Sequence, residues 1–223
     1  MQLTELNKPA PLAKMAYDAL RSSILSHTLT TDMIYNEKKL AEQLGISRTP
    51  VREALLELSS QGLITFLPRK GVIVRRFTDK DIEEIFELRH IIETGTFNKI
   101  CSQRDALDFT EIEESLTAQK FIATTTRDIS AFMDLDRNFH MAFTRLVGNH
   151  RLIAIMENIR DILHIMGTHA LSAEGRMDKV VEEHKNIVQS VRQGDTGKAL
   201  SLLEDHLDLS KAAVKRNPPP FKG

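Results

Sequence analysis

Apolar residues recur every three or four positions along most of the chain, a period that predicts amphipathic helices rather than strands. The first such helix begins near Leu12, and beyond residue 77 the period continues almost to the C-terminus. Thr78, Asp108 and Asp128 are expected to cap three of the later helices. The breaks in the pattern predict helices at about 78–103, 108–124, 128–147, 150–171, 176–193 and 196–215. The second part of the chain is therefore predicted to be an all-α bundle of about six helices.

Residues 40–55 predict two helices joined by a tight turn. Gly45 adopts the left-handed backbone conformation of such a turn without steric cost, and Ser47 is expected to cap the second helix. That helix has an apolar face, and its N-terminal end carries polar residues on the other side: Arg48, Thr49 and Arg52. Side chains at this end of a DNA-docking helix reach base edges and phosphates. The alternative is an ordinary helical hairpin with a solvated arginine face.

The segment after this helix pair predicts a β-hairpin. Two runs of strand-forming residues, 63–67 and 72–76, flank a turn whose tip carries Arg69, Lys70 and Gly71. Helix, helix and hairpin is the order of a winged helix-turn-helix, whose wing can lie against DNA. The fold is thus predicted to be mainly α, with a winged helix-turn-helix domain (10–77) before the helical domain (78–216). A flexible arm (1–9) and a disordered tail (217–223) are expected at the ends.

Charge is distributed unevenly between the two predicted domains. The whole chain of 223 residues has a net charge of −1. Residues 1–76 hold 11 Lys and Arg against 7 Asp and Glu, a net of +4, and the remainder has a net of −5. Only the first domain is therefore expected to meet nucleic acid. The single cysteine, Cys101, and the lack of a signal peptide or membrane-length apolar run predict a soluble, cytoplasmic protein with no membrane partner.

The helix pair and hairpin resemble a known family. The runs Leu40–Ile46, Ser47–Leu55, Gly62–Ile64 and Pro68–Val72 closely resemble the DNA-binding domain of the GntR family of bacterial transcriptional regulators. In that family a basic residue at the position of Lys38 contacts DNA, so the resemblance adds Lys38 to the candidate DNA-binding residues. The chain departs from the family where a Pro-Gly turn is usual, because residues 29–33 read Leu-Thr-Thr-Asp-Met.

Four residues of the second domain have the spacing of metal ligands. Asp136 and His140 are four residues apart and so share one helix face. His184 and His206 are equidistant from the break at residues 194–195, so in an antiparallel helical hairpin their imidazoles can face each other. Three histidines and one aspartate suit a divalent ion such as Zn²⁺ or Ni²⁺, with Mn²⁺ as a further choice. The alternative is that four polar residues happen to lie in these helices.

The same four positions resemble the ligand set of the FCD domain, which follows the DNA-binding domain in the FadR subfamily of GntR regulators. The resemblance implies a metal at the floor of an effector pocket and a small carboxylate completing its coordination. It also implies a carboxylate-binding role for Arg89, whose alternative is a salt bridge with Glu93 on the same helix. Arg160 and His164 share a face of the helix predicted at 150–171 and are further candidates, although a histidine there also suits a core position.

These predictions favour a metabolite-responsive, DNA-binding transcriptional regulator over an enzyme. A homodimer is expected, because two-fold symmetry lets two recognition helices read a palindromic operator, and repression is the expected mode of action. The alternative is a metal-dependent hydrolase with a winged-helix appendage. A hydrolytic zinc site usually has three protein ligands, an open water position and a separate base, whereas four candidate ligands and no dedicated base are visible here. A structural zinc protein is a third possibility.

Overall fold

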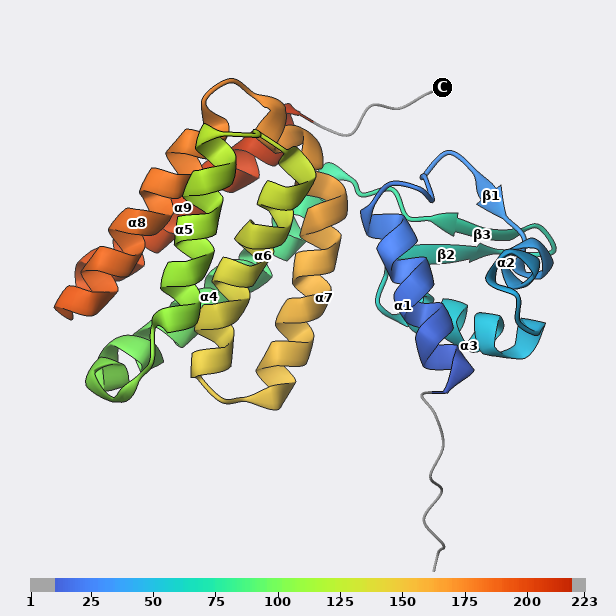
Figure 1. Cartoon of the computed structure of the whole chain (residues 1–223), viewed down its shortest axis with the longest axis horizontal. Coiled ribbons are helices and arrows are strands. Elements are labelled where there is room, and N and C mark those ends of the chain that lie inside the picture. Colours follow the sequence, from blue (N-terminus) through green and yellow to red (C-terminus); the bar gives the residue numbers. More distant parts are fainter. Residues whose placement is uncertain (1–10, 218–223) are drawn as a thin grey trace, which may run out of the picture. The chain divides into compact units, whose positions relative to one another are not determined.

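A computed structural model describes residues 11–217, and the chain divides between Arg76 and Phe77 into two compact units (Figure 1). The predicted arm at 1–9 and residues 218–223 of the predicted tail lie outside the described residues. Each unit is described by itself below.

In its described part, from residue 11 on, the first unit consists of three helices and a three-stranded antiparallel sheet. Its elements are α1 (Leu12–Leu25), β1 (Ile34–Tyr35), α2 (Glu37–Leu44), α3 (Arg48–Ser60), β2 (Ile64–Leu67) and β3 (Gly71–Val74). The apolar faces of the helices and of the hairpin form one core, with Leu20, Val51, Leu58 and Leu63 almost fully buried. The winged helix-turn-helix predicted from the sequence is confirmed.

The turn between α2 and α3 has the predicted geometry. Gly45 ends α2 in the left-handed conformation with φ of 67°, as the apolar period and the glycine together indicated. The Asn36 side chain caps the start of α2 by accepting a hydrogen bond from the Lys38 backbone N–H at 2.9 Å. Ser47 occupies the N-cap position of α3, but within residues 11–217 its side chain makes no capping hydrogen bond. The prediction of a capping hydrogen bond from Ser47 is therefore wrong, whereas the predicted start of α3 is correct.

A short strand that the sequence analysis did not predict completes the wing. β1 pairs with β3, matching Ile34 with Ile73 and Tyr35 with Val72, so β3 is the central strand of the order β1-β3-β2. Gly71 has φ of 132°, and a Cβ atom at this position would overlap the carbonyl oxygen of Tyr35. Gly71 is thus required by the close approach of β1 as well as by its backbone conformation.

A Gly71→Val substitution is therefore expected to separate β1 from β3. A positive φ at a non-glycine residue alone costs about 1–3 kcal/mol, and the overlap with Tyr35 adds to this cost. The expected result is roughly 5- to 150-fold faster amide hydrogen exchange in β1 and β3, with exchange in residues 79–216 unchanged. Thr65→Val, an exposed β2 position opposite Ile73, is the matched control. Unchanged exchange in the glycine variant would contradict this account.

Within the described residues, the regular elements of the second unit are all helices or 3₁₀ turns. Its elements are α4 (Asp79–Gln103), the 3₁₀ turn η1 (Arg104–Ala106), α5 (Thr110–Thr124), α6 (Ile129–Leu146), α7 (His150–Gly167), the 3₁₀ turn η2 (Thr168–Ser172), α8 (Arg176–Gln193) and α9 (Thr196–Arg216). Helix α4 packs along α9, α5 packs against α6 and α8, and α8 and α9 form an antiparallel hairpin (Figure 1). The predicted bundle of about six helices is confirmed.

Local capping explains most of the helix boundaries. Thr78 and Asp81 form a capping box at the start of α4, and Asp128 caps α6 by accepting from the Ala131 N–H. Asp108 accepts from the Thr110 N–H, although Phe109 is the residue that directly precedes α5. The helix predicted at 150–171 ends four residues earlier, at Gly167, and continues as η2.

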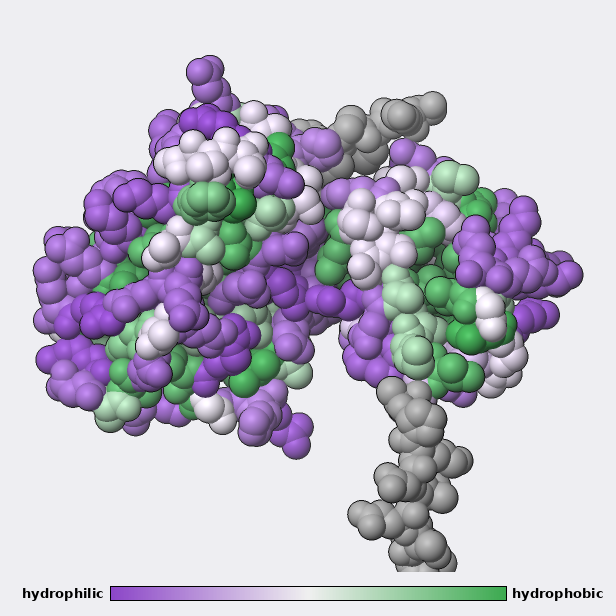
Figure 2. Space-filling model, viewed as in Figure 1, coloured by the Kyte–Doolittle hydropathy of each residue, from purple (hydrophilic) through white to green (hydrophobic). Residues whose placement is uncertain are grey.

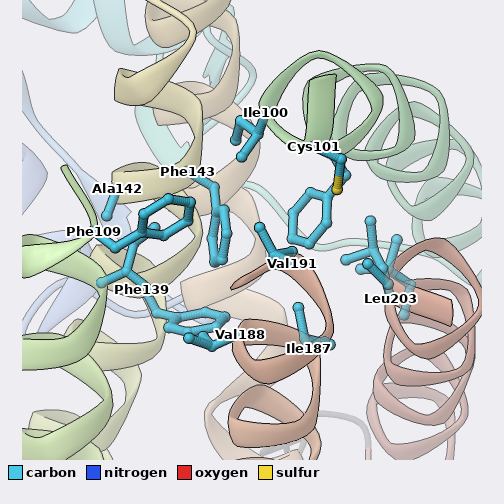
Figure 3. Packing of buried hydrophobic residues seen from close by; sticks show 14 residues of the cluster. Ile100, Cys101, Phe109, Phe139, Ala142, Phe143, Ile187, Val188, Val191 and Leu203 are labelled. Carbon is cyan, nitrogen blue, oxygen red and sulfur yellow. The ribbon is translucent and has the colours of Figure 1, made fainter. Parts of the chain in front are cut away.

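Two apolar clusters fill the bundle, with a polar layer between them. The larger cluster includes Phe139 and Phe143 from α6, packed against Ile187 and Val191 from α8 (Figure 3). The smaller cluster contains Phe132, Met133, Leu171, Met177 and Val180. Asp136 on α6 and His184 on α8 lie between the residues of the two clusters along their helices, and His140 follows Phe139 of the larger cluster. Polar side chains in the interior need partners, and this layer is where the candidate site lies.

The visible face of the second unit mixes hydrophilic and hydrophobic residues (Figure 2). Single exposed apolar side chains, such as Ile91 and Phe121, are ordinary on protein surfaces. Among the helices of residues 11–217, none has the length and hydropathy needed to cross a bilayer.

Candidate functional site

Three histidines from three helices converge in the polar layer. His140 on α6, His184 on α8 and His206 on α9 are almost fully buried, and each offers a ring nitrogen within 4.8 Å of the others. The Nε2 atoms of His184 and His206 lie 3.4 Å apart, which confirms that these two rings face each other across the α8–α9 turn. Asp136 Oδ1 lies 3.7 Å from His184 Nε2 and 4.0 Å from His140 Nε2. The four residues singled out by spacing are therefore brought together.

The other nitrogen of each ring, Nδ1, has a polar partner of its own. His140 Nδ1 lies 2.7 Å from Glu93 Oε2, and His206 Nδ1 lies 2.8 Å from Glu183 Oε2. A carboxylate can only accept a hydrogen bond, so both Nδ1 atoms carry the proton. The Nε2 atom of each ring points into the layer, and in the neutral form of the ring it carries a lone pair.

His184 is oriented by an amide instead of a carboxylate. Its Nδ1 lies 2.7 Å from Gln119 Oε1. The Gln119 amide is fixed in this orientation because its Nε2 donates to the Leu135 carbonyl at 3.0 Å. The ring also stacks on Phe139, with centroids 3.9 Å apart and planes 11° apart. Gln119 is fully buried and was missed by the sequence analysis, because an isolated glutamine in a helix carries no recognisable signal.

Burial and neighbouring charges keep His140 and His184 neutral and keep Glu93 and Asp136 ionised. Burial lowers the pKa of His140 to about 4, and burial together with the neighbouring His206 lowers the pKa of His184 well below its usual value. Burial alone would raise the pKa of Glu93 and Asp136. Nearby cations outweigh it, Arg89 beside Glu93 and Arg160 beside Asp136, so both carboxyl pKa values lie well below their usual range.

This chemistry fits a divalent cation. Neutral imidazoles with Nδ1 donating to an outer partner are the usual form of metal-binding histidine. The Nε2 atoms of His184 and His206 lie 3.4 Å apart, and a divalent cation can bind both atoms in the neutral form of the two rings. Asp136 adds a negative oxygen at the same point. The residues present therefore meet the requirements of a metal centre.

Three buried or half-buried arginines surround this centre, and each contacts one of its carboxylates. Arg89 Nε donates to Glu93 at 2.7 Å, Arg160 pairs with Asp136, and Arg176 Nη2 donates to Glu183 at 3.2 Å. The predicted alternative for Arg89, a salt bridge with Glu93, is thus present. Arg89 Nη2 also lies 3.4 Å from His140 Nε2, so the salt bridge and a place in the site are compatible.

A cavity lies next to the histidines, and it is lined by Asp136 and His206 among others. Arg89 and Arg160 line it, as the sequence analysis expected, and so do Arg176 and Ser210, which it missed. His164 does not: Leu163 lines the cavity, while His164 is buried with Nδ1 3.8 Å from Asp134 Oδ1. His164 therefore occupies the core position that the sequence analysis gave as the alternative to an effector contact.

The candidate DNA-binding residues of the first unit lie on its surface. Arg48, Thr49 and Arg52 are exposed at the N-terminal end of α3, opposite the buried Val51 and Leu55. Their side chains are not needed for the core, which leaves them available to a partner.

The remaining basic candidates are exposed as well. Lys38 lies in the first turn of α2, with Nζ 3.8 Å from Glu42. Arg69 and Lys70 form the exposed tip of the wing, where Arg69 takes a left-handed conformation with φ of 62°. Neither residue belongs to the core of the unit.

Comparisons with known proteins match both units. Residues 12–74 match the model of bacterial regulatory proteins of the gntR family, and residues 84–209 match the FCD domain. The HTH-type regulator YdhC of Bacillus subtilis is 27% identical over 85% of this chain and 84% of its own. The gluconate operon repressor of Bacillus licheniformis is 26% identical over 88% of this chain and 82% of its own.

A solved structure shows the same fold. The crystal structure of a GntR regulator from Rhodococcus sp. RHA1 superposes with a TM-score of 0.83, covering 93% of this chain and 99% of that one at 22% identity. The relatives and structural neighbours are transcription regulators and not enzymes, which leaves the hydrolase alternative without support. The winged helix-turn-helix, the histidine-lined helical bundle and these two family matches together identify the chain as a transcriptional regulator of the GntR family with a C-terminal FCD domain.

Proposed function

We propose that this regulator is a repressor that binds a palindromic operator as a homodimer and senses a small carboxylate at a metal centre. The observation that carries the metal part is the convergence of three Nε2 lone pairs, with every Nδ1 engaged by an outer partner. The repressor name of the Bacillus licheniformis relative supports the direction of regulation.

The metal ligands proposed are Asp136, His140, His184 and His206. Imidazole and carboxylate ligands suit Zn²⁺ or Ni²⁺, with Mn²⁺ also compatible. When bound, the ion supplies a positive centre that attracts an anionic effector. The chain's own contribution is to direct the Nε2 atoms toward one point and to keep Asp136 ionised beside Arg160.

The effector site proposed is the adjoining cavity. Arg89 and Arg160 present guanidinium groups to it, and arginine matches the planar geometry of a carboxylate. The effector role expected for His164 is not retained, because Leu163 lines the cavity in its place.

DNA contact is proposed for the exposed basic surface of the first unit. Arg48, Thr49 and Arg52 would meet bases or adjacent phosphates from the start of α3, and Lys38 would contribute from α2. Arg69 and Lys70 at the wing tip would add phosphate contacts that depend on salt more than on sequence. Gly71 holds this tip in place.

This proposal is tested by titrating DNA with the protein in the presence and absence of a small carboxylate. A palindromic operator, selected from random DNA by the protein itself, is titrated in the presence of gluconate or of hexanoate. Binding of an effector shifts DNA affinity only if it favours one state of the protein, so at least one acid is expected to shift the wild-type affinity. Neither acid is expected to shift that of His184→Ala. An equal shift in both proteins would show that the metal plays no part in sensing.

Gln119 provides a separate test of the metal centre. Gln119→Leu removes the acceptor of the His184 Nδ1 proton and is expected to lower metal affinity by about 10- to 100-fold. Ser115→Ala is a matched control, because Ser115 Oγ donates to the same Leu135 carbonyl at 3.0 Å but does not orient His184. Affinity is measured by competition with a chelator of known strength. If Gln119→Leu binds the metal with wild-type affinity, the Gln119 amide does not contribute to the metal centre.

A further inference from the structure

We infer that the effector is a carboxylate with a hydrocarbon body, and not a hydroxylated acid. This inference rests on the proposed function, because it concerns the ligand of the same cavity. It is argued from the division of the cavity wall into a charged part and an apolar part.

The charged part of the wall lies where the cavity meets the histidines. It consists of Arg89, Asp136, Arg160, Arg176, His206 and Ser210. One carboxylate group can be held there, by the guanidinium groups and by a cation on the Nε2 atoms. The rest of the molecule must then lie against the remaining wall.

That remaining wall offers side chains without hydrogen-bonding groups. It includes Met133 from α6, Leu163 from α7, Leu171 from η2, Val180 from α8, and Ala213 and Val214 from α9. These six residues come from five different elements, so the apolar character is a property of the cavity and not of one helix face. A hydroxyl group moved from water to such a wall loses its hydrogen bonds without replacement, whereas a methylene group gains from burial.

The polar groups of the charged part are already engaged with one another. Arg176 Nη2 donates to Ser210 Oγ at 3.2 Å as well as to Glu183, and Arg160 pairs with Asp136. A row of hydroxyl groups on the ligand would have to compete with these bonds. A single carboxylate beside a cation would not, because it adds an acceptor where donors and positive charge converge.

Gly167 keeps the apolar end of the cavity open. It lines the cavity at the end of α7, and a Cβ atom there would lie 3.5 Å from Met133 Cε and 3.9 Å from Val214 Cγ2. These are ordinary contact distances, so alanine fits without displacing its neighbours. The added methyl group would take space from a bound hydrocarbon chain while leaving the charged part unchanged.

Hexanoate and gluconate test the inference as a matched pair, since both have six carbons and one carboxylate, and gluconate adds five hydroxyl groups. Calorimetric titration of the full, metal-loaded chain is expected to show hexanoate binding at least about tenfold more tightly. Equal or tighter binding of gluconate would overturn the inference and leave carboxylate sensing intact. If neither acid binds to the metal-loaded protein, both this inference and the proposed carboxylate sensing are wrong.

The Gly167→Ala variant shows whether hexanoate occupies this cavity. Its hexanoate affinity is expected to fall several-fold while its metal affinity stays at the wild-type value. Gly95→Ala is the matched control, because Gly95 is an exposed position within α4 whose added Cβ would meet nothing within 4 Å. If Gly167→Ala binds hexanoate as tightly as Gly95→Ala does, the acid binds elsewhere and the inference is wrong.

Discussion

The His184→Ala protein is expected to purify with almost no divalent metal, in contrast to the wild type. His184 is the proposed metal ligand from α8, and it lies between the proposed ligands of α6 and His206 on α9. A metal that binds only the folded state stabilises it by mass action, by roughly 2.7 kcal/mol at 100 times its dissociation constant. A chelator should therefore lower the melting temperature of the wild type and leave that of His184→Ala unchanged.

The matched control for this variant is His164→Ala. His164 is also a buried histidine of the bundle, but it lies outside the three-histidine cluster. Its removal should cost packing energy without loss of metal, so it separates general destabilisation from loss of a ligand. Metal per chain is measured by mass spectrometry, and unfolding by calorimetry with and without chelator. A full complement of metal in His184→Ala would refute the proposed ligand set.

The Arg52→Ala protein is expected to lose about 1–3 kcal/mol of specific operator binding, which is roughly a 5- to 150-fold loss of affinity. Arg52 is exposed on the first two turns of α3, and the buried Val51 and Leu55 fix the helix on the rest of the unit. Truncation of Arg52 is therefore expected to remove the proposed contact to DNA without disturbing the core. Affinity for the operator and for unrelated DNA is compared by gel shift.

A charge-matched variant separates base reading from bulk electrostatics. Lys80→Ala also removes one exposed positive charge, at the start of α4, where Lys80 lies 3.4 Å from Glu84. It should leave the ratio of specific to non-specific affinity unchanged, whereas Arg52→Ala should lower that ratio. If the two variants behave alike, Arg52 contributes only charge and α3 does not read bases through it.

The elements of both units are encoded locally and could be predicted from the sequence. Helical period, capping residues and left-handed glycines act over four or five residues, so the capping box of Thr78 and Asp81 and the turn at Gly45 follow from neighbouring residues. The pairing of His184 with His206 was also predictable, because a short turn fixes the register of two antiparallel helices. β1 was missed, since two residues are too few to show a strand period.

The partners of the histidines were decided only by the tertiary structure. Glu93, Gln119 and Glu183 come from α4, α5 and α8, and nothing in the spacing of these residues relates them to the rings that they orient. Arg176 and Ser210 reach the cavity for the same reason, through the packing of α8 against α9. The cavity wall contains Leu163 and not the expected His164, which shows most clearly what the sequence alone does not determine. One residue turns a side chain by about 100° around a helix of 3.6 residues per turn, and only packing against the other helices fixes that rotation.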